Sequence, residues 1–456
     1  MTDPLLSFFT SMESQGSVIV TETPKLDLDL YIQNYRGRTR FDRLYLIGRT
    51  STVLCVDALK AAVAEAKKGK DVQRYRDAVE CLRVAAPSDP DAVLDRAWVE
   101  HIERSNKAET QRLETELKGY KNNLVKESIR MGNEDLGKHY ESIGDLDKAT
   151  DAYARMRPDV STPKHLVDVG KHLVRVSLQR REWAMAAAHL NKMTPSPNSG
   201  EENVLRPYTK IVQGICFLGQ DKFHDAALSF LQTDSVIPPS SYNEIASPND
   251  VAIYGGLLAL ASMDRASLQS KVLDNQNFRA FLELEPHIRK AVAQFVNGRY
   301  SACLSILESC RPDYLLDIYL QGHIPKIYSE IRSKCIVQYL IPFSCVTLDS
   351  MNESFASPGE SIEEELAGMI RSGTLNARIN SIDKLVTTAS TNARSQMQLA
   401  TLKAVRKYQK EAIERVRRMS LVAADLEVKA PRRIPGVQTS LEQLNDVSMF
   451  DDVSSS

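Results

Sequence analysis

A three-position pattern, which recurs in the second helix of several predicted helical hairpins, most constrains what this chain can fold into. In each copy a large side chain is followed three residues later by a small one, and four residues after that by another large one. The pattern occurs four times, as Leu146-Ala149-Tyr153, Trp183-Ala186-Leu190, Phe223-Ala226-Phe230 and Tyr300-Cys303-Leu307. A small residue lets two helices approach closely, and the large ones fill the groove to the next hairpin. The sequence therefore predicts helical hairpins that stack on one another.

The spacing of this pattern indicates the kind of array. Its first three copies follow one another at intervals near the roughly 34 residues of a tetratricopeptide repeat. The longer interval before Cys303 leaves room for one more hairpin around residues 251–282. We therefore predict a mainly α fold, in which a right-handed, tetratricopeptide-like repeat array covers residues 26–312.

The sequence changes character after Asp313. Amphipathic patterns predict three helices, and alternating apolar and polar residues then predict a β-hairpin. The helices lie around residues 324–331, 348–355 and 361–371, and the strands at 375–380 and 384–388. Three helices followed by a hairpin are typical of a winged helix, so we predict this fold for residues 313–390.

One long helix is predicted from residue 391 to residue 428. Mainly apolar side chains recur along it at intervals of three and four residues, which is the seam of a helix that packs against other helices. The seam consists of Leu402, Val405, Gln409, Ala412, Val416, Met419, Ala423 and Leu426.

Both ends of the chain are expected to be disordered. Residues 1–25 mix Ser, Thr, Glu and Pro without helical periodicity. Pro431 and Pro435 end the long helix, and residues 436–456 contain acidic side chains without a single Lys or Arg. Segments of this kind cannot bury enough apolar surface to fold alone, so we predict a disordered arm at 1–25 and a disordered acidic tail at 429–456.

The composition argues against a general attraction to polyanions or membranes. The chain of 456 residues has 58 Lys and Arg against 59 Asp and Glu, a formal net charge of -1. No overall field therefore draws it to nucleic acid or to an anionic membrane. Its longest uncharged, mostly apolar run, residues 251–263, is far shorter than the roughly 20 residues needed to cross a bilayer, and it predicts a buried helix. No secretory signal is recognisable, and seven scattered cysteines indicate neither a disulfide framework nor a zinc ribbon. We expect a cytoplasmic and nuclear protein.

Catalytic signatures are absent from the sequence. It contains no HExxH, no Gly-x-Ser-x-Gly and no complete P-loop. Gly214 and Gly219 have the Walker spacing, but a Gln and an Asp follow where Lys and Ser or Thr would bind phosphate and magnesium. His165 and His172 could share a helical face, yet no further ligand completes a metal site. We assign no catalytic, cofactor-binding or metal-binding residue and predict that the protein is not an enzyme.

Winged helices often bind DNA, but the charges of this one argue against that role. Residues 359–371, in the place of a recognition helix, contain four acids against the single Arg371. The phosphates of the major groove would repel such a helix. The open edge of the wing hairpin and the long helix remain as the working surfaces, because an open strand edge can accept a neighbour's strand. The sequence thus predicts an assembly component, and a DNA-binding regulator is the less favoured alternative.

The order of these parts resembles a known family. Helical repeats that run into a winged helix and a long terminal helix are similar to the PCI module of the proteasome lid, the COP-9 signalosome and a translation initiation factor, and the PCI part would begin near residue 205. Five strings resemble COP-9 signalosome members in particular: Leu26-Asp-Leu-Asp-Leu-Tyr31, Tyr120-Lys-Asn-Asn-Leu-Val-Lys-Glu-Ser-Ile-Arg130, Asp135-Leu-Gly-Lys-His-Tyr140, Phe281-Leu-Glu-Leu-Glu-Pro286 and Leu315-Leu-Asp-Ile-Tyr319. The resemblance covers about residues 26–428. The related lid subunit shares the architecture and is the main alternative, although Phe-Leu-Glu-Leu-Glu-Pro is not typical of it.

This resemblance implies a non-catalytic scaffold in a complex that removes a ubiquitin-like modifier from cullins and so regulates cullin-RING ubiquitin ligases. The activity would lie in a different, metal-binding subunit, and no cofactor is implied here. The expected partners are the other PCI-domain and MPN-domain subunits, with cullin-RING ligases as a further contact of the helical arm.

The resemblance also suggests where the partners bind. The wing sheet would join neighbouring PCI subunits edge to edge, through Leu375, Ala377, Ile379, Leu385 and Val386. The terminal helix would enter a bundle of helices from all subunits, through Leu402, Val405, Gln409, Ala412, Val416, Met419 and Leu426.

Overall fold

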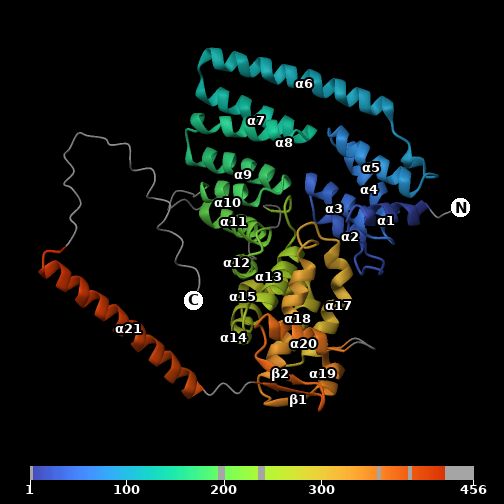
Figure 1. Ribbon diagram of the computed structural model, residues 1–456. Coiled ribbons are helices and arrows are strands. Elements are labelled where there is room, and N and C mark those ends of the chain that lie inside the picture. Colours follow the sequence, from blue (N-terminus) through green and yellow to red (C-terminus); the bar gives the residue numbers. More distant parts are fainter. Residues whose placement is uncertain (1–3, 194–200, 235–241, 357–360, 389–392, 427–456) are drawn as a thin grey trace. The chain divides into compact units, whose positions relative to one another are not determined.

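The computed structural model describes the chain except residues 1–3, 194–200, 235–241, 357–360, 389–392 and 427–456. The chain packs as two separate units, residues 1–388 and residues 389–456 (Figure 1). Helices dominate the described part, and the only sheet within it has three strands. The predicted mainly α fold is therefore confirmed. The predicted acidic tail at 429–456 lies outside the described residues.

The first unit begins with helices that precede the repeats. These are α1 (Pro4–Ser14), α2 (Leu28–Gln33), α3 (Arg38–Thr50), α4 (Cys55–Lys68), α5 (Val72–Ala85), the 3-10 turn η1 (Pro90–Ala92) and the 28-residue α6 (Arg96–Asn123). From α6 onward each helix packs on its neighbour in the chain as far as α13 (Figure 1). Local contacts of this kind are what a repeat array requires.

Four helix pairs carry the pattern expected from the sequence. They are α7 (Lys126–Ile143) with α8 (Leu146–Arg155), α9 (Pro163–Gln179) with α10 (Trp183–Asn191), α11 (Glu201–Leu218) with α12 (Phe223–Leu231), and α16 (Pro286–Val296) with α17 (Tyr300–Leu315). The 3-10 turn η2 (Arg157–Asp159) follows α8. Leu146, Trp183, Phe223 and Tyr300 each begin the second helix of a pair, so this prediction is confirmed. The small residue of every copy is fully buried.

Glycines on the first helix of a pair leave space for large side chains of the second helix. A Cβ atom on Gly137 of α7 would lie 2.5 Å from the ring of Tyr153, and one on Gly214 of α11 would lie 2.6 Å from the ring of Phe230. Real Cβ atoms do not approach other atoms this closely. The predicted buried helix at Gly214 is confirmed, and its glycine serves helix packing instead of phosphate binding.

The same turn joins the two helices of all four pairs. Each turn contains a left-handed residue two positions before the second helix: Gly144 (φ 91°), Arg181 (φ 60°), Asp221 (φ 60°) and Gly298 (φ 77°). The N–H of the following residue donates to the carbonyl five residues earlier, which is the Schellman arrangement. Two of the turns therefore hold a side chain where glycine is the usual residue.

An additional hairpin lies between the third and fourth pairs, as predicted from the spacing. It contains α13 (Pro248–Ser262), α14 (Arg265–Ser267), the π-helical turn η4 (Leu268–Leu273) and α15 (Gln276–Leu284). Most residues of α13 are buried, and it contacts α12, α15, α16 and α18. The apolar run at 251–263 is thus the central helix of the largest core.

A winged helix follows α17. It consists of α18 (Ile324–Leu340), β1 (Cys345–Thr347), α19 (Leu348–Phe355), α20 (Glu363–Arg371), β2 (Ala377–Asn380) and β3 (Leu385–Thr388). Ile324, Ile327 and Ile331 are fully buried, as the helical pattern predicted. Strand β1 was not predicted, because three residues are too short to show an alternating pattern.

The prediction of a disordered arm at residues 1–25 is wrong for its described part, which begins at residue 4. Residues 4–14 form α1, which buries Phe8 and Phe9 in the N-terminal core and contacts α5. Leu5 and Met12 pack against the same core. These four apolar residues have the spacing of one helical face, which the abundance of Ser, Thr and Glu in this segment obscured.

Arg43 of α3 joins three distant parts of the first unit. Its side chain is fully buried and forms ion pairs with Asp250 of α13 (2.9 Å) and with Asp317, just after α17 (2.7 Å). It also donates a hydrogen bond to Tyr31, while Tyr254 donates one to Asp317 (2.7 Å). Although burial disfavours its charge, Asp250 and the other partners raise the pKa of Arg43 well above its ordinary value. This cluster fastens α2 and α3 to the segment that leads into the winged helix.

The second unit contains α21 (Ala393–Ala423). The helix was predicted to run to residue 428, but it ends five residues earlier. Asp425 has a left-handed backbone (φ 55°), and the N–H of Leu426 donates to the carbonyl of Leu421. Leu426 therefore belongs to the turn that ends the helix.

Candidate assembly interfaces

The strand order of the wing sheet determines which strands have an open edge. Strand β3 lies between β1 and β2 and is antiparallel to both. Leu385 and Val386 are on this central strand, so their assignment to the edge is corrected. Among the described strands, β1 and β2 each have a partner on one side alone, and an unpaired side of this kind can accept another strand.

The predicted wing residues mostly point into the domain itself. Leu375 and Ala377 are each 6% exposed and Val386 is 0% exposed, and all three belong to the main apolar core, which includes side chains of α20. Ile379 and Leu385 are half-buried. These side chains hold the wing on its helices. An edge-to-edge contact would therefore use the backbone of β1 or β2.

Exposed apolar side chains beside the sheet were missed in the sequence. Ile341 (66% exposed) and Phe343 (45% exposed) lie between α18 and β1, and the Thr388 hydroxyl of β3 donates to the Phe343 carbonyl (2.7 Å). Ile382, in the turn between β2 and β3, is 94% exposed. The signal that could have revealed them is a bulky apolar residue next to a helix end or inside a predicted turn, where nothing in the chain would cover it.

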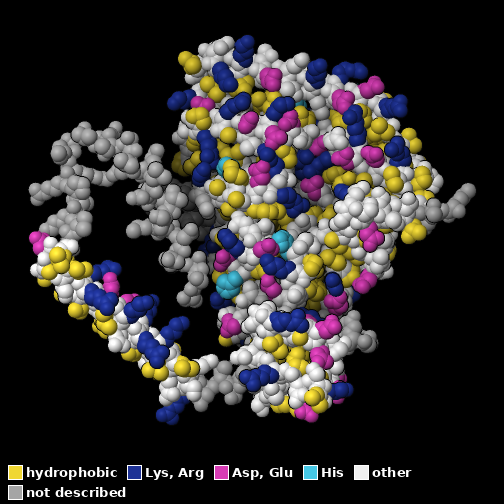
Figure 2. Space-filling view, viewed as in Figure 1, with side chains coloured by type: hydrophobic (Ala, Val, Ile, Leu, Met, Phe, Trp, Pro, Cys, Tyr) yellow, Lys and Arg dark blue, Asp and Glu magenta, His cyan; other side chains and the backbone are white. Residues whose placement is uncertain are grey.

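The seam of α21 is exposed along its length. Leu402, Val405, Val416 and Met419 have between 54% and 70% of their surface open, as does Leu426 beyond the helix end. Gln409 is also exposed and Ala412 is half-buried. Figure 2 shows apolar side chains along one side of this helix and basic ones beside them. Large apolar residues exposed in a continuous row mark a surface for a protein partner or a membrane.

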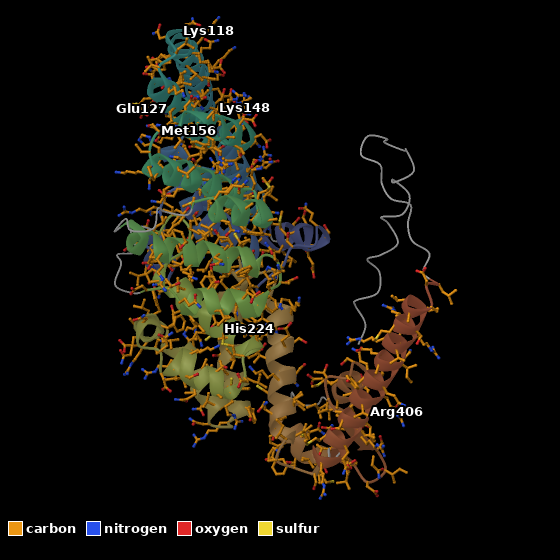
Figure 3. All side chains as sticks on the ribbon, turned by 90° about the vertical axis from the view of Figure 1, so that its left-hand side faces the viewer. Lys118, Glu127, Lys148, Met156, His224 and Arg406 are labelled. Carbon is orange, nitrogen blue, oxygen red and sulfur yellow. The ribbon has the colours of Figure 1, made fainter. Side chains whose placement is uncertain are left out.

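Tyr408 (72% exposed) and Ile413 (46% exposed) extend the apolar side of α21, although the seam prediction omitted them. At 100° per residue both lie next to seam positions on the helical wheel. Lys403, Lys407 and Lys410 fall on the other side of the wheel. Figure 3 shows side chains projecting from α21 along its length, with Arg406 labelled. The helix is therefore amphipathic. Within the described part of the second unit, no apolar core covers its apolar side.

The histidines considered as metal ligands have other roles. His172 stacks on the ring of Tyr153 with centroids 4.6 Å apart, and its Nδ1 lies 3.0 Å from Nη2 of Arg175. His165 Nδ1 lies 3.8 Å from a Glu127 carboxylate oxygen. In the described residues, no group of three or more His, Cys, Asp or Glu side chains could hold a metal ion. Nor does any helix in that part of the chain have the length and apolar character needed to span a membrane.

Two family models match the chain in the regions just described. Residues 95–271 match the model described as 26S proteasome subunit RPN7, and residues 307–390 match the PCI domain. The first match covers α6 to α13 and the second contains the winged helix.

Full-length relatives decide between the members of this group. The chain is 54% identical to the COP9 signalosome complex subunit 1 of Neurospora crassa over 438 residues, which is 96% of each protein. It is 46% identical to the protein of the same name from Emericella nidulans, over 94% of this chain and 88% of the relative. The chain belongs to the COP9 signalosome subunit 1 family. This confirms the family resemblance inferred from the five sequence strings.

The proteasome alternative is only a distant relationship. The 26S proteasome non-ATPase regulatory subunit 6 of rice is 23% identical to this chain over 345 residues. A COP9 signalosome subunit 1 shares more than twice that identity over nearly the whole chain. The shared architecture therefore reflects a common fold, while the sequence places this protein with the signalosome subunits.

Proposed function

We propose that this chain is a non-catalytic scaffold subunit of the COP9 signalosome, which deneddylates cullins and so regulates cullin-RING ubiquitin ligases. It joins the other PCI-domain and MPN-domain subunits through α21 and through the open edges of the wing sheet. Its helical repeats extend from this assembly and offer a surface to cullin-RING ligases. The complex acts in the cytoplasm and the nucleus.

The observation that carries this proposal is the exposed seam of α21. A 31-residue helix whose apolar side is open to solvent lacks the packing that normally stabilises helices in proteins. Burying a large apolar side chain contributes about 1.5–3 kcal/mol when it is fully exposed beforehand. Several such residues in one row, at intervals of three and four, fit a bundle with helices of other subunits.

The charges of the winged helix support protein binding over DNA binding. Glu363, Glu364 and Glu365 lie in the first turn of α20, and Glu365 forms an ion pair with Arg332 of α18 (2.8 Å). Acids at the position of a recognition helix would repel DNA phosphates. The proposal therefore assigns the winged helix to subunit contacts.

Substitutions on α21 test the proposal. We expect the variant with Leu402→Asp, Val405→Asp and Val416→Asp to be lost from the complex, because charged side chains cannot be buried unpaired in a helical bundle. The first unit should keep its thermal unfolding transition, since it packs separately from α21. Incorporation is measured by co-purification with the other subunits from the native host.

A matched control changes the same number of charges on the other side of α21. The variant with Lys403→Gln, Lys407→Gln and Lys410→Gln lowers the net charge by three, as the three new aspartates do. It should stay in the complex. Equal incorporation of the seam variant and the wild type would show that α21 does not hold the chain in the assembly.

A further inference from the structure

A cavity of about 480 Å³ lies where α3, α9 and the segment after α17 meet. Its volume is within the range of about 300–1,000 Å³ that is usual for small-molecule sites. Four arginines line it, together with the two carboxylates Asp42 and Glu244. The arginines are Arg49 of α3, Arg74 of α5, Arg175 of α9 and Arg181 in the turn after α9. None of the surfaces proposed above for subunit assembly includes this cavity.

Two of the four arginines are already neutralised by carboxylates. Arg74 pairs with Asp42 at 2.7 Å. Arg175 pairs with Glu141 at 2.7 Å and with Glu244 at 3.1 Å. Both carboxylates that line the cavity, Asp42 and Glu244, take part in these ion pairs. No carboxylate of the lining therefore balances the charges of the other two arginines.

Arg49 and Arg181 are held by neutral groups. The Arg49 guanidinium lies over the ring of Tyr45 (5.4 Å to the centroid), and its Nη2 donates to the sulfur of Met12 (3.6 Å). Arg181 lies over the ring of Tyr319 (5.2 Å) and donates to the Ile318 carbonyl (2.8 Å). Neither forms an ion pair with a described carboxylate. Rings and carbonyls of this kind orient a guanidinium without cancelling its charge.

The backbone at Arg181 indicates that its side chain has a specific role. Arg181 stands at the left-handed position of its turn, where two of the related turns have Gly144 and Gly298. Residues other than glycine adopt this conformation at a cost in free energy. The segment it contacts also reaches α3, because Gln321 donates to the Thr50 hydroxyl (3.2 Å) next to Arg49. Arg181 thus contacts one end of this short segment at Ile318, and the other end, at Gln321, holds the residue that follows Arg49.

We propose that this cavity binds a small phosphate-bearing molecule, with Arg49 and Arg181 balancing its negative charge. A phosphate monoester carries a charge of about -1.5 to -2 at neutral pH, which matches two guanidinium groups. The planar fork of arginine suits phosphate oxygens, and a cavity of this size suits a small molecule better than an extended peptide.

Calorimetric titration of the purified full-length chain with inorganic pyrophosphate, in about 0.15 M salt to screen weak surface attraction, tests the site. We expect saturable binding at one site per chain. Arg49→Gln and Arg181→Gly should each weaken binding at least tenfold. Arg181→Gly supplies the residue found in the related turns, so the protein should keep its fold, which its thermal unfolding midpoint verifies. Arg83→Gln is the matched control, because Arg83 is an exposed arginine of α5 that pairs with Glu80 and does not line the cavity.

The outcomes distinguish a specific binding site from general attraction of anions. Binding that Arg49→Gln and Arg181→Gly weaken, but Arg83→Gln does not, supports the proposal. The proposal is overturned if pyrophosphate does not bind, or if all three variants bind it equally. It is also overturned if a hexaglutamate peptide, and not pyrophosphate, binds in a manner that depends on Arg49 and Arg181, since the cavity would then receive an acidic protein segment.

Discussion

Single glycines set the distance between the helices of a repeat. Gly137 leaves space for the ring of Tyr153, whereas a Cβ atom on Gly119 of α6 would meet nothing within 4 Å. Substitutions at these two positions therefore distinguish the effect of close packing on stability from the effect of helix propensity. Both are inside helices, so the same substitution can be compared directly.

We expect Gly137→Ala to lower the free energy of unfolding by about 1–3 kcal/mol, because the new methyl group overlaps a buried ring. Gly119→Ala should instead raise it, by up to about 1 kcal/mol, since alanine favours the helix. Urea unfolding followed by circular dichroism measures both. Destabilisation of the same size in the two variants would contradict the assigned role of Gly137.

A half-buried histidine makes the stability of the repeats depend on pH. Burial, and then the charge of Arg175, lower the pKa of His172 below its ordinary value, although Glu134 lies 3.7 Å from its Nε2. The unfolded chain therefore binds this proton more readily than the folded one. The contribution of neutral His172 is present above about pH 6.5 and is lost as the pH falls below that value.

We expect wild-type protein to lose more stability between pH 7.5 and pH 5.5 than His172→Phe, which keeps a ring against Tyr153 but cannot titrate. Urea unfolding at the two pH values gives the difference. Equal losses in both proteins would show that His172 does not titrate differently in the folded and unfolded states.

At the scale of elements, two exposed large apolar residues precede β1, whereas Ile382 alone follows β2 in its turn. Ile341 and Phe343 are exposed next to β1, while β2 carries the exposed polar residues Arg378 and Asn380. An added strand that buries exposed apolar side chains gains stability from that burial as well as from its backbone hydrogen bonds. The β1 edge is therefore the better candidate for a neighbouring subunit.

We expect Ile341→Asp to reduce the recovery of at least one PCI-domain partner several-fold, because the new charge would be buried at the contact. The stability of the isolated chain should change by less than about 0.5 kcal/mol, as is usual for exposed positions. Quantitative mass spectrometry of the purified complex measures the partner. Met185→Asp, at a position of α10 that is 50% exposed, is the control and should leave recovery unchanged.

At the scale of the whole molecule, Arg43 connects the N-terminal helices to the rest of the first unit. We expect Arg43→Met to lower the free energy of unfolding by about 3–5 kcal/mol, because Asp250 and Asp317 would remain buried without their partner. Replacing both carboxylates as well, with Asp250→Asn and Asp317→Asn, should recover part of this loss. Chemical unfolding of the single and triple variants provides the comparison. A single variant within about 1 kcal/mol of the wild type would contradict the role of this cluster.

The sequence predicts best what depends on local periodicity. The start of each second helix, the buried helix at 251–263 and the helices of the winged domain follow from patterns of three and four residues. It also pointed to α21, whose seam has a regular spacing. The Arg43 cluster could not be predicted in this way, since Arg43 and Asp317 are 274 residues apart in the sequence. The order of the sheet was missed for the same reason, because the pairing of β1 and β2 with the distant or later strand β3 decides it.

The interfaces were predicted less completely than the fold. Spacing alone identifies the apolar side of α21, and the structure adds Tyr408 and Ile413 to it. Spacing in the sequence cannot distinguish an inward from an outward side chain on a short strand. The buried residues Leu375, Ala377 and Val386 were therefore placed at the edge, and the exposed Ile341 was overlooked. The cavity between α3 and α9 joins residues from six separate stretches of the chain and leaves no trace in the order of the sequence.

Affinity purification of the tagged full-length chain from its native extract, followed by sizing and mass spectrometry, tests the central claim most directly. The scaffold function predicts that the chain is recovered in a large particle together with other PCI-domain subunits and an activity that deneddylates cullins. Recovery with proteasome subunits, or as a monomer without partners, would contradict it.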